Sequence, residues 1–136
     1  MTDFANLENL IAAVIDHGFH LHSALGPGLL ESAYEAFLSA SFSEAGFHVE
    51  QQVAFPASYR STTIQNAFRI DLLIERKLVV EIKSVERLAP VFQKQVLTYL
   101  RLTGLPVGLL INFGNPTYEG AARRVIDSRH AYQGQH

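Results

Sequence analysis

The sequence predicts a single α/β domain over residues 1–136, with a mixed sheet flanked by helices. Three observations support this class. Apolar residues recur at helical spacing in two segments, a third helix is indicated by Pro90 at its start and Gly104 at its end, and apolar runs of strand length lie between and after the helices. The predicted order is α-α-β-β-β-α-β, which can be followed by one more short strand. Helices interleaved with strands favour a layered α/β architecture, and this chain length is typical of one domain.

The first two predicted elements are helices. The first covers residues 4–24, and the segment Leu25-Gly26-Pro27-Gly28 ends it. The second follows directly and ends at Gly46, in the manner of a C-terminal glycine. Each helix has an apolar stripe, formed in the first by Leu7, Leu10, Ile11 and Val14 and in the second by Leu30, Tyr34, Phe37, Leu38 and Phe42.

The middle of the chain predicts three strands. The first covers residues 48–55 and is expected to stop at Pro56. Residues 59–66 are polar and rich in turn formers, which favours a connection. Two apolar runs, 70–74 and 78–83, then predict adjacent buried strands joined by a turn at residues 75–77.

The last third predicts a helix and one or two strands. Pro90 is suited to the first turn of a helix, which extends to about residue 103 and is closed by Gly104. Residues 107–113 predict a buried strand, residues 114–116 a turn, and residues 123–126 a short final strand. The polar tail from Ser128 is expected to be frayed.

Three charged residues interrupt the two adjacent apolar runs: Asp71, Glu81 and Lys83. Burying a charge is costly unless it is paired or binds a metal. Glu81 and Lys83 are two residues apart and so share one face of their strand. A turn centred near Arg76 places Asp71 opposite Glu81, where two carboxylates repel unless a cation lies between them. Mg²⁺ prefers oxygen ligands of this kind, so the pattern predicts a metal-dependent phosphodiester-cleaving site.

Other interpretations of these charges are available. Glu81 and Lys83 could form a weak ion pair on a solvated strand, and Asp71 could discourage aggregation at a sheet edge. Glu31 lies in the first turn of the second helix, where a carboxylate is favoured by the helix dipole. Gln95 and Tyr99 share one helix face at i, i+4 spacing, either solvated or holding a phosphate oxygen. The histidines at positions 17, 20 and 22 do not share one face and are expected to be ordinary helix residues.

The charge of the chain is divided along its length. Residues 1–59 contain seven acidic residues and no Lys or Arg, whereas residues 60–136 contain eleven basic and six acidic residues. The basic half can attract phosphates locally, although the net charge is −2. The absence of cysteine excludes disulfides and thiol catalysis. No run is long enough to span a membrane, and the start lacks a basic signal-peptide region, so a cytoplasmic protein is expected.

Several segments together resemble one known family. Residues 25–34 are similar to the signature of the bacterial GxxExxY family, which is itself similar to the PD-(D/E)XK nuclease superfamily. The Gln-x-x-x-Tyr pattern resembles the RecB-like branch. The segments that carry the likeness lie within about residues 7–126 and are Leu25–Tyr34, Phe68–Leu72, Val80–Lys83, Leu88–Pro90, Gln95–Leu100 and Gly108–Gly114.

The resemblance implies an α-β-β-β-α-β core with a four-stranded mixed sheet, and a role for each site residue. Asp71 and Glu81 would bind Mg²⁺ or Mn²⁺ with the Ile82 carbonyl, and Glu31 would be an extra ligand. Lys83 would be the lysine of the motif, supported by Gln95 and Tyr99. The implied substrate is nucleic acid, DNA more than RNA. The alternative is a non-catalytic binding module with a nuclease fold. A protein partner for targeting and a homodimer are both compatible with the sequence.

Overall fold

The computed structural model describes residues 4–129, and over these the chain forms three helices and five strands. From residue 130 on, the tail that the sequence predicts to be frayed lies outside the described residues. In chain order the elements are α1 (Phe4–Leu25), α2 (Glu31–Glu44), β1 (Val49–Tyr59), β2 (Thr62–Ile74), β3 (Leu78–Lys83), α3 (Pro90–Thr103), β4 (Val107–Asn112) and β5 (Ala122–Ile126).

The strands form one mixed sheet in the order β1-β2-β3-β4-β5. β3 and β4 are parallel, and every other neighbouring pair is antiparallel. The predicted mixed sheet is therefore confirmed. The expected count of four strands is wrong, because β5 pairs with β4 and covers its outer edge. The parallel crossover between β3 and β4 contains α3.

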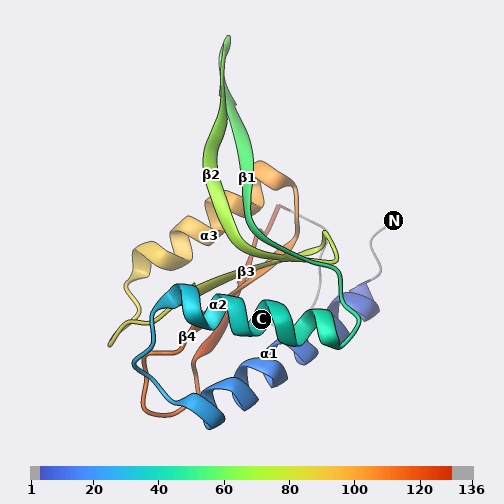
Figure 1. Ribbon diagram of the computed structural model, residues 1–136. Helices are drawn as coiled ribbons and strands as arrows, with labels where there is room; N and C mark the ends of the chain where they lie inside the picture. The colour runs from blue at the N-terminus through green and yellow to red at the C-terminus, as the bar shows by residue number, and fades with distance from the viewer. Residues whose placement is uncertain (1–3, 130–136) are drawn as a thin grey trace.

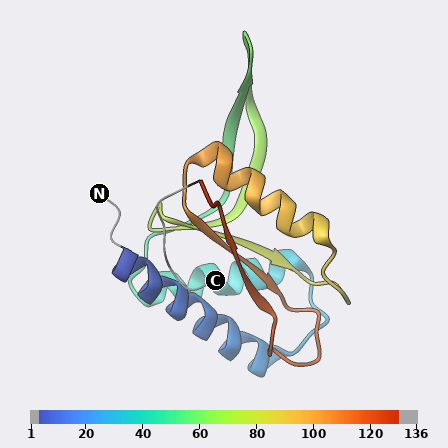
Figure 2. The same ribbon diagram turned by 180° about the vertical axis from the view of Figure 1, so that it is seen from behind.

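The helices form two layers, with α1 and α2 on one face of the sheet and α3 on the other (Figures 1 and 2). Alternate strand residues serve the two layers. Val80 and Ile82 pack with residues of α1 and α2, whereas Val79 packs with Val96 and Leu100 of α3. The layered α/β prediction follows from these two apolar faces. None of the helices in residues 4–129 is long and apolar enough to cross a membrane.

The β1–β2 hairpin is longer than the sequence predicts. β1 does not stop at Pro56 but continues to Tyr59, and the expected connection at residues 59–66 is largely the start of β2. The strand register shifts between Phe55 and Ala57, so Pro56 lies at an irregularity of an edge strand. A missing N–H is tolerated at such a position. The outer part of the hairpin projects from the body of the molecule (Figure 1).

Candidate active site

Asp71 and Glu81 lie at the strand fork, the point beyond the Leu72–Val80 pair where β2 and β3 diverge. The register pairs Leu72 with Val80 and Ile74 with Leu78, which centres the hairpin on Arg76 as predicted. Beyond the Leu72–Val80 pair, side-chain carboxylates take the place of backbone carbonyls as the acceptors of the hydrogen bonds between the two strands. The Asp71 N–H donates to Glu81 Oε1 over 2.9 Å, and the Ile82 N–H donates to Asp71 Oδ2 over 2.9 Å. Each carboxylate is therefore held by the backbone of the opposite strand.

Burial gives Glu81 unusual proton affinity. The residue is 3% exposed, and burial followed by the nearby Asp71 carboxylate raises its pKa from 4.5 to about 8. The Asp71 N–H and the Lys83 ammonium act in the opposite direction but do not cancel this increase. In the metal-free protein at neutral pH, Glu81 is therefore protonated, and the Asp71 carboxylate lies beside a neutral carboxyl group.

Lys83 lies on the α3 side of the sheet, two residues beyond Glu81. Its side chain is half-buried, and Nζ lies 4.6 Å from the centroid of the Phe92 ring. The two residues line a cleft of about 470 Å³ together with Gln95 of α3. Among residues 4–129 no carboxylate forms an ion pair with the Lys83 ammonium, so its N–H groups can turn from the Phe92 ring toward a ligand in the cleft.

Gln95 and Tyr99 approach the carboxylates from α3. Gln95 lies one helical turn before Tyr99, near enough for its side chain to lower the pKa of the Tyr99 hydroxyl. Burial, followed by the charges of Glu81 and Asp71, raises the pKa of Tyr99 above its usual value of 10. The pair therefore lies within the electrostatic field of the two carboxylates and is not a solvated helix face.

Glu31 lies on the other side of the carboxylates and is joined to the end of β3. Its Oε2 accepts a hydrogen bond from the Ser84 N–H over 3.1 Å. Glu31 and Asp71 line one cleft of about 460 Å³. Ser84, which the sequence did not indicate, also donates through Oγ to the Leu29 carbonyl over 2.9 Å. The start of α2 is thus attached to the residue that follows Lys83.

Tyr34 explains the spacing of the segment before α2. Its buried ring stacks on Phe113 with 4.4 Å between the centroids. Its hydroxyl donates to the Gly26 carbonyl over 2.5 Å and accepts from the Leu29 N–H over 3.3 Å. Gly26 has a φ of 69°, which favours glycine. Tyr34 is therefore a structural residue that fixes the loop leading to Glu31.

Sequence reasoning missed a second acidic group in the same cleft. Glu35 is 8% exposed, and burial is the main cause that raises its pKa above 4.5. Its two oxygens accept from Gln51 and Gln52 over 3.1 and 2.6 Å, and Gln52 also donates to Asp71 Oδ1 over 3.2 Å. Glu35 follows Glu31 by four residues, which places both on one helix face and was an available signal.

Gln52 has a backbone conformation that is rare for its residue type. Its φ is 52°, and the ladder pairs on both sides of it continue while Gln52 and Asp71 are not paired. Residues with a Cβ are disfavoured in this region, and such positions concentrate at functional sites. Here the unusual backbone accompanies a side-chain amide that contacts both Glu35 and Asp71.

The donor set at the strand fork fits a hard divalent cation. The Asp71 and Glu81 carboxylates and the Ile82 carbonyl are all oxygen donors, and the repulsion between the carboxylates is what a cation relieves. Within residues 4–129, however, no three or more His, Cys, Asp or Glu side chains are already grouped to hold a metal. Glu31 is therefore not assembled with the two strand carboxylates, although it lines the same cleft as Asp71.

The helix histidines have structural partners. His17 lies 2.6 Å from the Ser41 hydroxyl, and His22 donates through Nε2 to the Asn115 carbonyl over 2.7 Å. His20 is on the surface, 3.5 Å from Asp16. These contacts agree with the expectation that they are ordinary helix residues.

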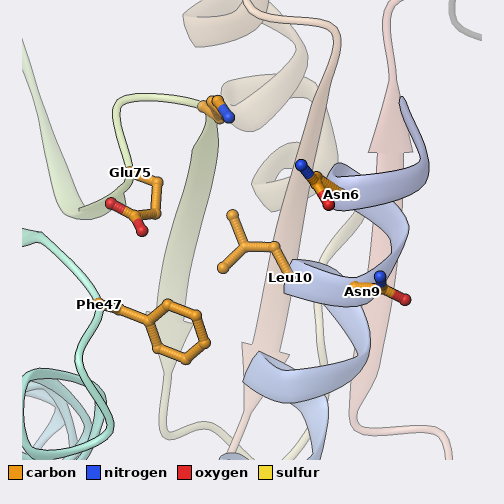
Figure 3. Close-up of a pocket in the computed structure, with 6 residues that line it drawn as sticks. Asn6, Asn9, Leu10, Phe47 and Glu75 are labelled. Carbon is orange, nitrogen blue, oxygen red and sulfur yellow. The ribbon is translucent and has the colours of Figure 1, made fainter. Parts of the chain in front are cut away.

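A separate cavity of about 280 Å³ lies between the start of α1 and the β2–β3 turn. The Leu10 side chain and the Phe47 ring face each other there, with Glu75 beside them and Asn6 and Asn9 on the helix (Figure 3). None of the candidate site residues lines this cavity. Its position and lining do not connect it with the chemistry of the strand fork.

Comparison with known proteins gives one family. The family model described as the PD-(D/E)XK nuclease superfamily matches residues 8–125. Neither the curated proteins nor the solved structures give a significant match. The matched range contains the strand fork, the Glu81-x-Lys83 pair and both flanking helix layers. The chain therefore belongs to the PD-(D/E)XK nuclease superfamily, whose members generally use divalent metals such as Mg²⁺.

Proposed function

We propose that the protein is a metal-dependent nuclease that hydrolyses phosphodiester bonds in nucleic acid, of the GxxExxY type and close to the RecB-like branch. The observation that carries this proposal is the pair of opposed carboxylates, Asp71 and Glu81, with Lys83 on the same face of β3 as Glu81. The family supports a nuclease-like function for such a site.

Each site residue has a role in this proposal. Asp71, Glu81 and the Ile82 carbonyl would hold Mg²⁺ or Mn²⁺, and Glu31 would be a further ligand from the neighbouring helix. A divalent ion bound there lowers the pKa of a coordinated water and neutralises charge on the phosphate.

The α3 side supplies the remaining groups. Lys83 donates hydrogen bonds to the attacking water or to a phosphate oxygen, and so offsets charge in the transition state. Gln95 orients a phosphate oxygen or water, and Tyr99 holds Gln95 in position. The cleft that Lys83 and Gln95 share is open enough for a phosphate group.

The direct test is cleavage of labelled single- and double-stranded DNA and RNA during titration of Mn²⁺ into the pure protein. We expect cleavage that EDTA abolishes and that Asp71→Asn removes. Asp16→Asn, an exposed carboxylate of α1, is the matched control and should retain activity. Mn²⁺-independent cleavage, or equal cleavage by wild type and Asp71→Asn, would contradict the proposal.

The alternative is a binding module that keeps the fold and acts through a protein partner. An exposed apolar side chain at the cleft favours it, because Leu30, the residue before α2, lines the same cleft as Glu31 and Asp71 and is 77% exposed. Binding of nucleic acid or of a protein without any cleavage at saturating Mn²⁺ would favour this function over the nuclease.

A further inference from the structure

The outer part of the β1–β2 hairpin is a two-stranded ribbon without a covering layer. Beyond the register shift it contains the pairs Ala57–Ile64, Ser58–Thr63 and Tyr59–Thr62. Tyr59 is 73% exposed and Ile64 is 56% exposed. Both views show this part standing clear of the helices (Figures 1 and 2). Because an isolated two-stranded ribbon gains little stability of its own, its length calls for a functional explanation.

The ribbon has the charge and polarity expected of a surface that meets a polyanion. No Asp or Glu occurs from Gln51 to Ile70, whereas Arg60 and Arg69 do. Within the described residues the Arg60 guanidinium has no carboxylate partner and lies 5.2 Å from the centroid of the Tyr59 ring. The other exposed side chains near the tip are hydrogen-bonding groups, among them Ser58, Thr62, Thr63, Gln65 and Asn66.

Arg60 occupies a position where glycine or asparagine is expected. Tyr59 pairs with Thr62, so Arg60 and Ser61 form the two-residue turn, and Arg60 has a φ of 54°. Hairpin turns of this length with positive φ favour Gly, Asn or Asp. Arg76 in the β2–β3 turn has the same φ of 54°, but its guanidinium pairs with Glu50, whereas within the described residues the Arg60 guanidinium has no carboxylate and can contact a ligand.

The ribbon is joined firmly to the candidate site. One strand, β2, contains both the ribbon residues from Thr62 and the site residue Asp71, although its pairing with β1 shifts register over residues 65–67. At the base of the ribbon, Phe55 stacks on Phe68 with 5.5 Å between centroids, and Phe68 stacks on Tyr99 with 4.6 Å. A ligand that contacts the ribbon is therefore held at a defined position relative to the carboxylates.

We propose that this ribbon enters the major groove of duplex DNA whose backbone lies at Asp71 and Glu81. The proposal rests on the proposed nuclease function and names its substrate class. The major groove is about 12 Å wide and about 8.5 Å deep and admits a two-stranded ribbon. Three paired residues per strand lie beyond the register shift, and at ~3.3 Å per residue they extend about 10 Å, enough to reach the groove floor. The ribbon cannot enter duplex RNA in this way, because the major groove of duplex RNA is deep and too narrow.

The test is equilibrium binding in Ca²⁺, which permits metal-site occupancy without Mg²⁺ or Mn²⁺. Fluorescence anisotropy would compare duplex DNA, duplex RNA of the same sequence and single-stranded DNA. One variant shortens the ribbon by replacing residues 57–66 with Asn-Gly, a favoured two-residue turn. We expect it to lose duplex DNA affinity by about tenfold or more and to leave the two other affinities unchanged, since groove contacts carry the specific part of binding.

A point variant avoids the risk of misfolding. Arg60→Gly removes the side chain and relieves the disfavoured backbone, so its melting temperature should be equal to or above that of wild type. Its affinity for duplex DNA should fall, and the slope of log affinity against log salt should decrease by about 1 if the guanidinium contacts a phosphate. Lys77→Ala, which removes a basic residue from the β2–β3 turn, is the matched control and should change neither.

Three results would overturn the proposal. The first is unchanged duplex DNA affinity in both ribbon variants. The second is an equal loss for all three ligands, which would indicate general electrostatic attraction. The third is a change from dimer to monomer on shortening, seen by sedimentation velocity, which would make the ribbon a self-association element. Hydrolysis of bis(p-nitrophenyl) phosphate in Mn²⁺ tests the nuclease function separately. If the wild type does not hydrolyse this compound but binds duplex DNA through the ribbon, only the catalytic function is refuted.

Discussion

The Asp71 backbone N–H donates to the carboxylate of Glu81, 2.9 Å away on the neighbouring strand. The Ile82 N–H returns a similar bond to Asp71, so each carboxylate is oriented by the opposite strand before any ligand arrives. Preorganised groups lose little freedom on binding. The same arrangement buries Glu81 beside a second carboxylate, and burial first, followed by the charge of Asp71, raises the pKa of Glu81.

The first prediction concerns pH. Folded Glu81 has a pKa of about 8, above its ordinary 4.5, so the folded protein binds this proton more tightly than the unfolded chain. The stabilisation is complete below about pH 4.5 and is lost as the pH rises toward 8. In EDTA, Glu81→Gln should remove this loss and be more stable than wild type at about pH 8, by roughly 2–4 kcal/mol. Urea unfolding across the pH range measures it; parallel curves for wild type and variant would refute it.

The second prediction concerns metal binding at Asp71. We expect calorimetry with Mn²⁺ to show binding by wild type and a large loss in Asp71→Ala, because one of two strand carboxylates is removed. The Gln52 and Ile82 donors that contact Asp71 remain in the variant, so a melt must confirm its fold. Equal Mn²⁺ affinity in wild type and Asp71→Ala would remove the metal site from the strand fork.

The third prediction concerns Lys83. Lys83→Ala should keep the fold and Mn²⁺ binding but lose about 10²-fold or more in cleavage rate, the usual scale for a charge-stabilising or proton-transferring group. Lys94→Ala, an exposed lysine at the same cleft, is the control for general loss of positive charge and should change the rate much less. Similar rates for the two variants would reduce Lys83 to a surface charge.

The fourth prediction separates the two glutamates of α2. Glu31 is exposed and accepts from the Ser84 N–H, a bond that a glutamine carbonyl can also accept. Glu31→Gln should therefore leave metal-free stability nearly unchanged and reduce the rise in melting temperature caused by Mn²⁺. Glu35→Gln should instead raise metal-free stability above the ordinary pKa of the carboxyl, since burial disfavours its charge. An unchanged Mn²⁺ effect in Glu31→Gln would make Glu31 a helix-start residue.

The fifth prediction concerns Tyr34, whose hydroxyl makes two hydrogen bonds to the loop before α2. Tyr34→Phe keeps the ring stacked on Phe113 and removes both bonds. We expect a loss of about 1–3 kcal/mol in the free energy of unfolding, at ~0.5–1.5 kcal/mol per bond. Tyr59→Phe, at the exposed ribbon tip, should show almost no loss in the same urea experiment. A Tyr34→Phe variant as stable as wild type would mean that the loop is held without the hydroxyl.

The position of the two carboxylates could be predicted because it depends on local rules alone. Two apolar runs and a short turn determine the register, and the period of two then determines which residues are opposed. The hairpin centre at Arg76 is confirmed by the pair Leu72–Val80. The end of α3 could be predicted for a similar local reason. Gly104 adopts a left-handed conformation with a φ of 76°, and glycine is the residue that most often ends a helix in this way.

Other features depend on contacts between distant segments and could not be predicted. Glu35 accepts hydrogen bonds from Gln51 and Gln52, which belong to a strand that the sequence pattern does not place against α2. Ser84 has a role only because β3 ends beside the loop at Leu29. Residues 59–66 favour a connection by sequence because Pro56 and the turn-forming residues after it have low strand propensity. Pairing between β1 and β2 overrides that propensity in the structure.

The two helix layers also give the molecule an electrical polarity. The layer formed by α1 and α2 contains no Lys or Arg, whereas α3 on the opposite face contains Lys94 and Arg101 and no acidic residue. Charge is thus separated across the thickness of the sheet, and the field of an approaching polyanion exerts a torque on the protein. Such torque acts within the screening distance, about 8 Å at physiological salt. If the proposed nucleic-acid substrate approaches, this charge separation would turn the molecule with α3 foremost before any side chain touches the polymer.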